Sequence, residues 1–343
     1  MRVPLRAFAA LALLLSAAAP VLAAEEPVLN LYSARHYQTD EALYDNFTKA
    51  TGIRINRIEA GDEQLVERLK NEGAASPADV LLIVDAARLW QAQQMGLFQP
   101  VKSAVLEERI PAKYRDPAGD WYGFSYRARV IVYNKAMVDR GAVATYELLA
   151  DPRNKGKVCT RSGSHPYNLS LIGAMIAHLG GAGAEAWAKG VVANFARMPK
   201  GGDTDQIKAV AAGECAVALT NTYYYARLMR STAPADREIV AKTAVVFPDQ
   251  ESYGTHVNVS GAGVMKNAPH RENATKFLEY LASPDAQRYF ADGNNEWPVV
   301  ATVTVANPAL DALGKFKSDP LPIATLGRNT AEAQRIADRS GWR

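Results

Sequence analysis

Residues 28–58 read VLNLYSARHYQTDEALYDNFTKATGIRINRI and contain a strand, a helix and a second strand. Residues 28–32 form a short, mostly apolar run, and 53–58 alternate between apolar and polar side chains, as strands do. Between them, 40–51 has the spacing of a helix, with Asp40 expected as its N-cap and Gly52 as its end. Strands joined by helices favour parallel pairing. The stretch therefore predicts an α/β fold with a largely parallel sheet.

The same alternation of elements continues along the chain. We expect strands at 78–84, 126–133, 157–160, 216–220 and 254–264, and helices at 63–72, 86–94, 168–179, 272–281 and 330–337. A second α/β unit interrupts the first, so the chain crosses between two units twice, which is typical of two lobes with a hinge. We expect the first lobe to comprise residues 28–128 and 254–303, and the second 129–253 and 304–343.

The amino terminus has the pattern of an export signal. Arg2 and Arg6 give a positive start, 7–19 is nearly all apolar, and Ala23 is the expected cleavage position of a leader spanning 1–23. No cysteine follows that could carry a lipid anchor, and charged residues interrupt the later apolar stretches. We therefore expect a soluble periplasmic protein.

The charge balance argues against nucleic acid as a partner. The formal net charge is +3, and loss of Arg2 and Arg6 with the leader lowers it to +1. A near-neutral chain lacks the broad basic surface that nucleic acid or anionic lipid requires.

Cys159 and Cys215 are the only cysteines, and each lies in or next to an expected strand. Export into an oxidising compartment would allow them to form a disulfide. On the chain-entropy model such a bond stabilises the fold by roughly 4 kcal/mol. Two buried thiols without a bond are the alternative, and the residues do not decide between them.

The sequence carries no strong enzyme signature. It has no Gly-x-Ser-x-Gly, no phosphate-binding loop and no pair of histidines four residues apart on a helix. Residues 181–186, GAGAEA, match a dinucleotide fingerprint, but they follow an expected helix where that motif needs a strand. We expect no enzyme activity.

Tyrosines gather where the expected strands end. Tyr223, Tyr224 and Tyr225 are consecutive directly after the strand at 216–220, Tyr167 follows the strand at 157–160, and Tyr37 follows the first strand. The carboxyl ends of strands are where ligands bind in doubly wound folds. Phenolate is a hard anionic donor that suits a trivalent ion such as ferric iron. Packing of amphipathic aromatics, or stacking on an organic ligand, is the alternative.

Four motifs resemble the ferric-iron-binding periplasmic proteins of ABC importers, the FutA/FbpA family. They are LYSARHYQTD at 31–40; SPADV at 76–80 with DAARLW at 85–90; RSGS at 161–164 with YNLS at 167–170; and NTYYYAR at 221–227. The likeness runs from about residue 28 to Trp342. The four motifs are specific to the family only when they are taken together. It implies the type II periplasmic-binding-protein fold, with a hinge and a ligand cleft between two lobes.

The resemblance also implies the site. It makes Tyr37, Tyr167, Tyr223 and Tyr224 phenolate ligands of a ferric ion, the transported cargo. His36 matches a histidine that coordinates iron in some members of the family. Tyr225 is outside the pattern and is expected to pack.

Three further residues have expected roles near this site. Asp85 matches a carboxylate that some members use, but an N-cap of the following helix is the simpler role for it. Four phenolates around a trivalent ion leave one negative charge, which Arg127 and Arg227 could offset.

The family likeness implies an inner-membrane ABC permease as partner and a monomeric protein. A binding protein for a polyamine, thiamine or sulfate is the alternative function, and an exported enzyme on the same scaffold is a third. Binding of ferrous iron and the presence of an additional anion stay open.

Overall fold

The computed structural model describes residues 27–35 and 39–343, so the expected leader, His36 and Tyr37 lie outside the described part of the chain. The strands are β1 (Val28–Ser33), β2 (Arg54–Glu59), β3 (Val80–Ile83), β4 (Tyr122–Asn134), β5 (Val158–Cys159), β6 (Val217–Asn221), β7 (Thr243–Val246), β8 (Val257–Val264) and β9 (Trp297–Pro298). The helices are α1 (Asp40–Thr51), α2 (Asp62–Glu72), α3 (Ala86–Gln94), α4 (Ala104–Arg109), α5 (Pro166–Ala193), α6 (Asp203–Ala212), α7 (Thr222–Arg230), α8 (Pro234–Lys242), α9 (Arg271–Leu281), α10 (Pro284–Asn294), α11 (Pro308–Leu313) and α12 (Ala324–Ser340). Short 3-10 turns are η1 (Gly73–Ala75), η2 (Ala112–Tyr114), η3 (Arg140–Val143), η4 (Glu147–Ala150) and η5 (Pro152–Asn154).

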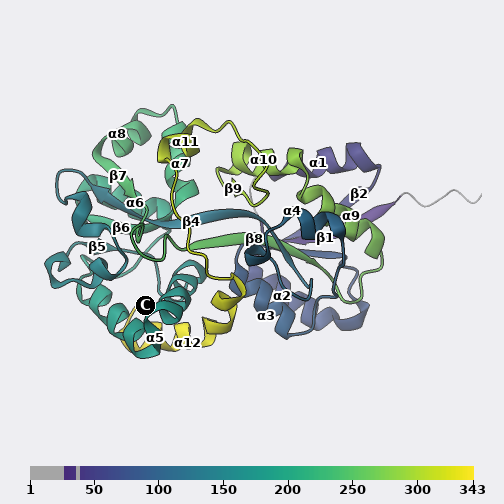
Figure 1. The fold of residues 1–343 in the computed structure, drawn as a ribbon, viewed down its shortest axis with the longest axis horizontal. Coiled ribbons are helices and arrows are strands. Elements are labelled where there is room, and N and C mark those ends of the chain that lie inside the picture. The colour runs from purple at the N-terminus through teal and green to yellow at the C-terminus, as the bar shows by residue number, and fades with distance from the viewer. Residues whose placement is uncertain (1–26, 36–38) are drawn as a thin grey trace, which may run out of the picture.

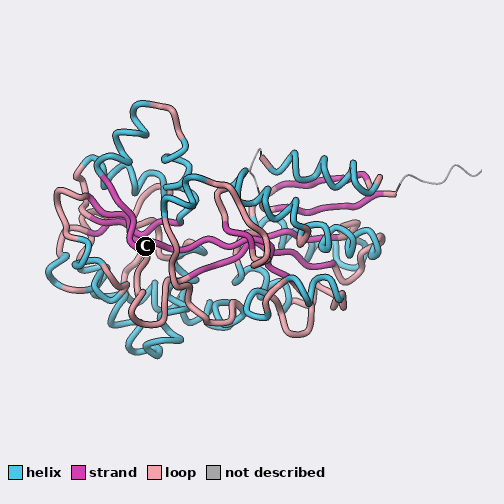
Figure 2. Tube along the Cα trace, turned by 45° about the horizontal axis from the view of Figure 1, so that its top comes forward, coloured by secondary structure: helices cyan, strands magenta, loops and turns pink. Residues whose placement is uncertain are grey.

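The molecule has two α/β lobes, which lie side by side along its long axis with β4 and β8 between them (Figure 1). Strands run through the middle of each lobe and helices cover both sides (Figure 2). The strand order is β2-β1-β3-β8-β4-β6-β5, with β7 and β9 also paired to β4. The α/β architecture in two lobes is therefore confirmed.

Strand β4 connects the lobes because it changes partner along its length. Its first part pairs with β8 up to Ala128, and its second part pairs with β6 from Arg129 onward. We propose the lobe boundaries that the sequence led us to expect, and this change of partner between residues 128 and 129 supports the first of them.

The expectation of a largely parallel sheet is wrong. β1 pairs parallel with β2 and β3, and β5 with β6, but β8 runs antiparallel to both β3 and β4. A strand that returns from the second lobe must run opposite to the strand that entered it, so the two crossings are antiparallel. The strand-helix-strand pattern describes only the outer part of each lobe.

One N-cap also differs from expectation. Thr39 is the N-cap of α1, and Asp40 is its first helical residue. The Asp40 carboxylate instead accepts from the guanidinium of Arg35 at 2.8 Å, and both side chains are buried. Gly52 ends α1 in the left-handed conformation, as expected.

Each lobe has its own apolar core. The larger core contains Leu31, Phe47 and Trp121, and the second contains Trp187 and Trp342, all at most 4% exposed. Most of each lobe therefore packs around its own core, although the larger core also includes residues of the second lobe such as Ala174.

Helix α5 is longer than expected because it continues past a kink at Gly180, whose φ is 71°. The stretch at 181–186 thus lies inside a helix, which excludes the strand-turn-helix context of a dinucleotide site. In length and composition α5 is apolar enough to cross a membrane, contrary to the expectation that charges interrupt every such stretch. Its residues Leu171, Ile172 and Met175 are buried in the second core, as in a core helix.

Candidate metal site

The pair Tyr223 and Tyr224 lies in the first turn of α7. Strand β6 runs directly into this helix, since Asn221 is its last residue and also the N-cap of α7. The two rings lie 4.3 Å apart, with Tyr223 only 2% exposed and Tyr224 half-buried. The first turn of a helix has unpaired N–H groups and a positive dipole end, which favour negative charge nearby. This position suits phenolate.

Tyr167 occupies the equivalent place on α5. It is the second residue of that helix, and its N–H donates to Nδ1 of the N-cap His165 at 3.3 Å. Burial, aided by Arg161, lowers the pKa of His165 to about 3, so the ring is neutral and can accept this bond. Two helix amino termini therefore present phenols to the same point.

The phenol oxygens of Tyr167 and Tyr223 lie 2.9 Å apart. The two tyrosines are 56 residues apart in the sequence. Tyr224 packs against Tyr223, so three of the four expected tyrosine ligands are brought together on the second lobe. The fourth, Tyr37, and His36 lie outside the described residues.

Arginines surround Tyr167. The guanidinium carbons of Arg127, Arg129 and Arg161 lie 5.7, 5.8 and 5.1 Å from its ring centroid. Arg127 and Arg129 are each 2% exposed. Positive charge held in a buried position lowers the free energy of a neighbouring phenolate more than it would in water.

Arg227 has a similar relation to the second ring of the pair. Its guanidinium carbon lies 5.8 Å from the centroid of Tyr224, and its side chain is exposed on α7. The structure thus places both Arg127 and Arg227, the expected charge partners, against expected ligands.

A buried network that the sequence did not reveal supports these groups. The Asp203 carboxylate, at the start of α6, accepts from Arg129 at 2.6 Å and from the N–H of Asn221 at 2.7 Å. The Asn168 side chain accepts from Arg129 at 2.9 Å and donates to the carbonyl of Arg161 at 3.0 Å. These residues hold the ends of β6 and the loop before α5. The period-2 spacing of Arg127 and Arg129 on one strand face was the only signal for this network.

Asp85 is an N-cap, as the sequence predicted. Its carboxylate accepts from the N–H of Ala87 at 2.8 Å, the hydroxyl of Ser170 at 3.1 Å and the amide of Asn258 at 2.9 Å. Its oxygens already accept protein hydrogen bonds, which leaves it poorly suited as a ligand.

Tyr225 packs away from the other two tyrosines of its run. Its hydroxyl donates to the carbonyl of Thr243 at 3.1 Å, and its ring is 4% exposed. This position agrees with the packing role expected from the sequence.

A hollow of about 720 Å³ lies beside the tyrosine pair. Tyr224, Arg227 and Lys208 line it from the second lobe, and Thr39 and Asn295 from the first. Tyr224 is therefore accessible from a space between the lobes. Within 27–35 and 39–343, no group of three or more His, Cys, Asp or Glu side chains could hold a metal ion. The donors that the described residues offer at this point are phenol oxygens.

Comparison with known proteins relates the chain to several iron-binding proteins. Residues 42–321 match the model of the bacterial extracellular solute-binding proteins. Iron uptake protein A2 of Synechocystis sp. is 53% identical over 321 residues, which cover 93% of this chain and 91% of that protein. The major ferric iron-binding protein of Neisseria meningitidis serogroup B is 28% identical, with 98% of each chain covered.

Solved structures give the same relation. FutA (IdiA) of Trichodesmium, in complex with iron and citrate ligands, matches with a TM-score of 0.88 and 53% identity, over 92% of this chain and all of that one. Apo FutA2 from Synechocystis matches with a TM-score of 0.88 and 52% identity, over 93% of this chain and all of that one.

Proposed function

Because this chain belongs to the family of bacterial extracellular solute-binding proteins, we propose that it captures ferric iron in the periplasm and delivers it to an ABC permease of the inner membrane. The iron-binding relatives cover nearly the whole chain, and the expected leader agrees with export. The protein acts as a carrier and not as an enzyme, and it works as a monomer.

The observation that carries this proposal is the meeting of Tyr167 and Tyr223 at 2.9 Å, with Tyr224 against them. Three phenols at two helix amino termini, with buried arginines beside them, form a site that favours anionic oxygen donors. Phenolates match a hard trivalent cation such as ferric iron. An organic cation such as a polyamine would instead call for carboxylates, and the Asp85 and Asp203 carboxylates are already bonded within the protein.

The proposed ligands are Tyr167, Tyr223 and Tyr224 of the second lobe, with Tyr37 and His36 taken from the sequence. Four phenolates leave one negative charge on the complex, which Arg127 and Arg227 offset from beside Tyr167 and Tyr224. In the proposed cycle the second lobe captures the ion first, and donors from the first lobe then close the cleft. Closure is favoured only by the additional bonds it makes to the metal.

The first test is the double variant Tyr223→Phe/Tyr224→Phe. It removes two hydroxyls and no ring, so the fold should be retained. Loss of even outer partners of a metal site costs 10–100-fold in affinity, so loss of two ligands should cost at least ~100-fold. A competition titration with ferric nitrilotriacetate measures the affinity, and the visible phenolate-to-iron charge-transfer band reports coordination.

Tyr225→Phe is the matched control, because that hydroxyl bonds to Thr243 and not to the pair. It should bind iron as the wild type does. Unchanged affinity in the double variant, or wild-type protein that stays colourless with ferric iron, would contradict the proposal and favour an organic or anionic solute.

A further inference from the structure

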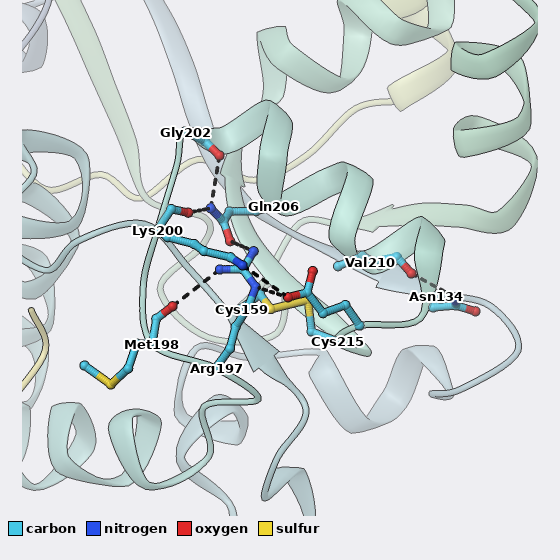
Figure 3. The surroundings of a disulfide bond; sticks show 10 residues. Asn134, Cys159, Arg197, Met198, Lys200, Gly202, Gln206, Val210 and Cys215 are labelled. Carbon is cyan, nitrogen blue, oxygen red and sulfur yellow. Dashed lines mark hydrogen bonds and ion pairs between the residues drawn. A yellow bond between two sulfur atoms is a disulfide. The ribbon is translucent and has the colours of Figure 1, made fainter.

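The disulfide between Cys159 and Cys215 joins β5 to the chain just before β6, and both of these strands lead into the metal site. Of the two readings of these cysteines, the bonded one is found, with the Cα atoms 5.9 Å apart. Both residues are at most 1% exposed. Figure 3 shows the bond beside the Arg197 side chain, which pairs with Glu214 at 2.7 Å. The buried bond thus links the last residue of β5 to the chain just before β6.

The spacing of the disulfide matches the spacing of the phenols. Cys159 and Cys215 are separated by 56 residues, and so are Tyr167 and Tyr223. Each tyrosine therefore follows its own cysteine by the same length of chain. β5 and β6 run parallel, so the two chain segments advance in the same direction toward the phenols, although Cys159 lies opposite Ala218 and not opposite Cys215.

Strand β5 is short. It has only two residues, with β6 on one side and the segment at 194–196 on the other, where the N–H of Val158 donates to the carbonyl of Asn194 at 3.0 Å. The bonds at its base are those from the N–H groups of Ala216 and Val217 to the carbonyl of Lys157, at 2.9 and 3.1 Å. A slip of one residue would move every side chain of a strand to the other face. A strand of only two residues that leads to a proposed ligand therefore benefits from a covalent register.

The segments beyond the disulfide are rigid enough to transmit that register. On the β5 side, Asn168 donates to the carbonyls of Arg161 and Ser162, both at 3.0 Å, which fixes the loop before Tyr167. On the β6 side, Asp203 accepts the N–H of Asn221, and the Thr222 hydroxyl accepts the N–H of Ala128 at 3.2 Å. Neither segment can absorb a shift of its strand without breaking these bonds.

We propose that the Cys159–Cys215 disulfide is a positioning device for iron capture, which sets the register of β5 against β6 and thereby the separation of the Tyr167 and Tyr223 phenols. The inference rests on the proposed iron-binding function. It differs from general stabilisation, in which the bond would raise the free energy of unfolding and leave the affinity of the folded protein unchanged.

The test compares Cys159→Ala/Cys215→Ala with the wild type, both folded and below their melting temperatures. The affinity for iron, titrated from ferric nitrilotriacetate, should fall ~10-fold or more, as for loss of an outer positioning partner. The charge-transfer band should shift, because the phenolate geometry changes. The matched control is Val191→Ala, which removes buried volume from the core of the same lobe and leaves the covalent link intact. It should lose stability and keep both affinity and band.

Equal affinity in the cysteine-free variant, or an equal loss in Val191→Ala, would overturn the proposal. If the alanine variant does not fold, Cys159→Val/Cys215→Ala keeps more of the buried volume and serves the same comparison. Failure of both to fold would also overturn it, since the bond would then be a condition of folding. A wild-type protein that binds no iron would instead refute the proposed function.

Discussion

A phenol becomes a good ligand for iron only when its surroundings favour the anion. Tyr167 lies in the first turn of α5, and three guanidinium groups lie within 5.8 Å of its ring. Asp203 accepts from two of those guanidiniums, Arg129 at 2.6 Å and Arg161 at 3.4 Å, which leaves a net positive field at the ring. The site thus favours the ionised form of Tyr167 before any metal binds.

The ionisation of the buried carboxylate of Asp85 affects the stability of the fold near this site. Burial raises its pKa to about 6, although Arg127 lies 3.9 Å away and the N–H of Ala87 donates to it. The folded protein therefore holds this proton more tightly than the unfolded chain does. The stabilising contribution is fully present below the unfolded pKa near 4 and is lost as the pH rises through 6.

Asp85→Asn should remove this pH dependence. Each pH unit between about 4 and 6 corresponds to ~1.4 kcal/mol. As the pH rises from about 4 to 6, the free energy of unfolding of the wild type should therefore fall by ~3 kcal/mol relative to that of the variant. The difference between the two proteins isolates Asp85, because their other carboxylates are the same. Urea denaturation at several pH values measures it, and a difference that does not change with pH would contradict the assignment.

The sequence could predict the residues that follow a strand, but not their distant partners. The N-cap role of Asp85 and the gathering of Tyr167, Tyr223 and Tyr224 follow from local patterns at strand ends. The link from Asp203 to Arg129 joins segments 74 residues apart, and no local pattern encodes it. Asp40 was misassigned for a different reason, since Arg35, only five residues before it, takes its carboxylate.

Helix α12, at the lower edge of Figure 1, has contacts with both lobes. It packs along α5 of the second lobe and also against α3 of the first (Figure 1). The contact with α3 depends on Gly327, because a Cβ there would overlap Cβ and Cγ of Trp90. A glycine inside a helix normally destabilises it by about 1 kcal/mol relative to alanine. At position 327 the close packing against Trp90 is therefore the reason for glycine.

Gly327→Ala should therefore destabilise the protein. The overlap with Trp90 forces α12 and α3 apart, and overpacking of this kind costs about 1–3 kcal/mol, more than the gain in helix propensity. Gly181→Ala is the matched control, since that glycine is also helical and a Cβ there meets nothing within 4 Å. It should be neutral or stabilise by up to ~1 kcal/mol. Denaturant midpoints measure both variants, and equal effects would contradict the packing argument.

At the scale of the whole molecule, the type II periplasmic-binding-protein fold expected from the family likeness is confirmed by the two lobes and the matching structures. The interruption of one α/β unit by another predicted the two lobes, and the family likeness implied the type II arrangement. The sequence could not predict the antiparallel crossings, since the partner of β8 is set by the return of the chain from a lobe that local patterns do not place.

Capture and closure should be separable steps, because Tyr167, Tyr223 and Tyr224 all belong to the second lobe. Bonds already present between the lobes, such as that of Ser170 to Asp85, do not involve the metal. The energy that closes the cleft must then come from the iron itself. Adding ferric iron should lower the radius of gyration measured by X-ray scattering. At free iron a hundred times Kd, it should also add about 2.7 kcal/mol to the free energy of unfolding.

Compaction and stabilisation should depend on the iron concentration in the same way. Neither should occur in Tyr223→Phe/Tyr224→Phe, because that variant does not bind the iron that favours closure. Tyr225→Phe should compact and gain stability as the wild type does. Stabilisation of the wild type without compaction would mean that the second lobe binds iron by itself and that the lobes do not close on it. Compaction of the double variant would mean that closure is driven by something other than the tyrosine-bound metal.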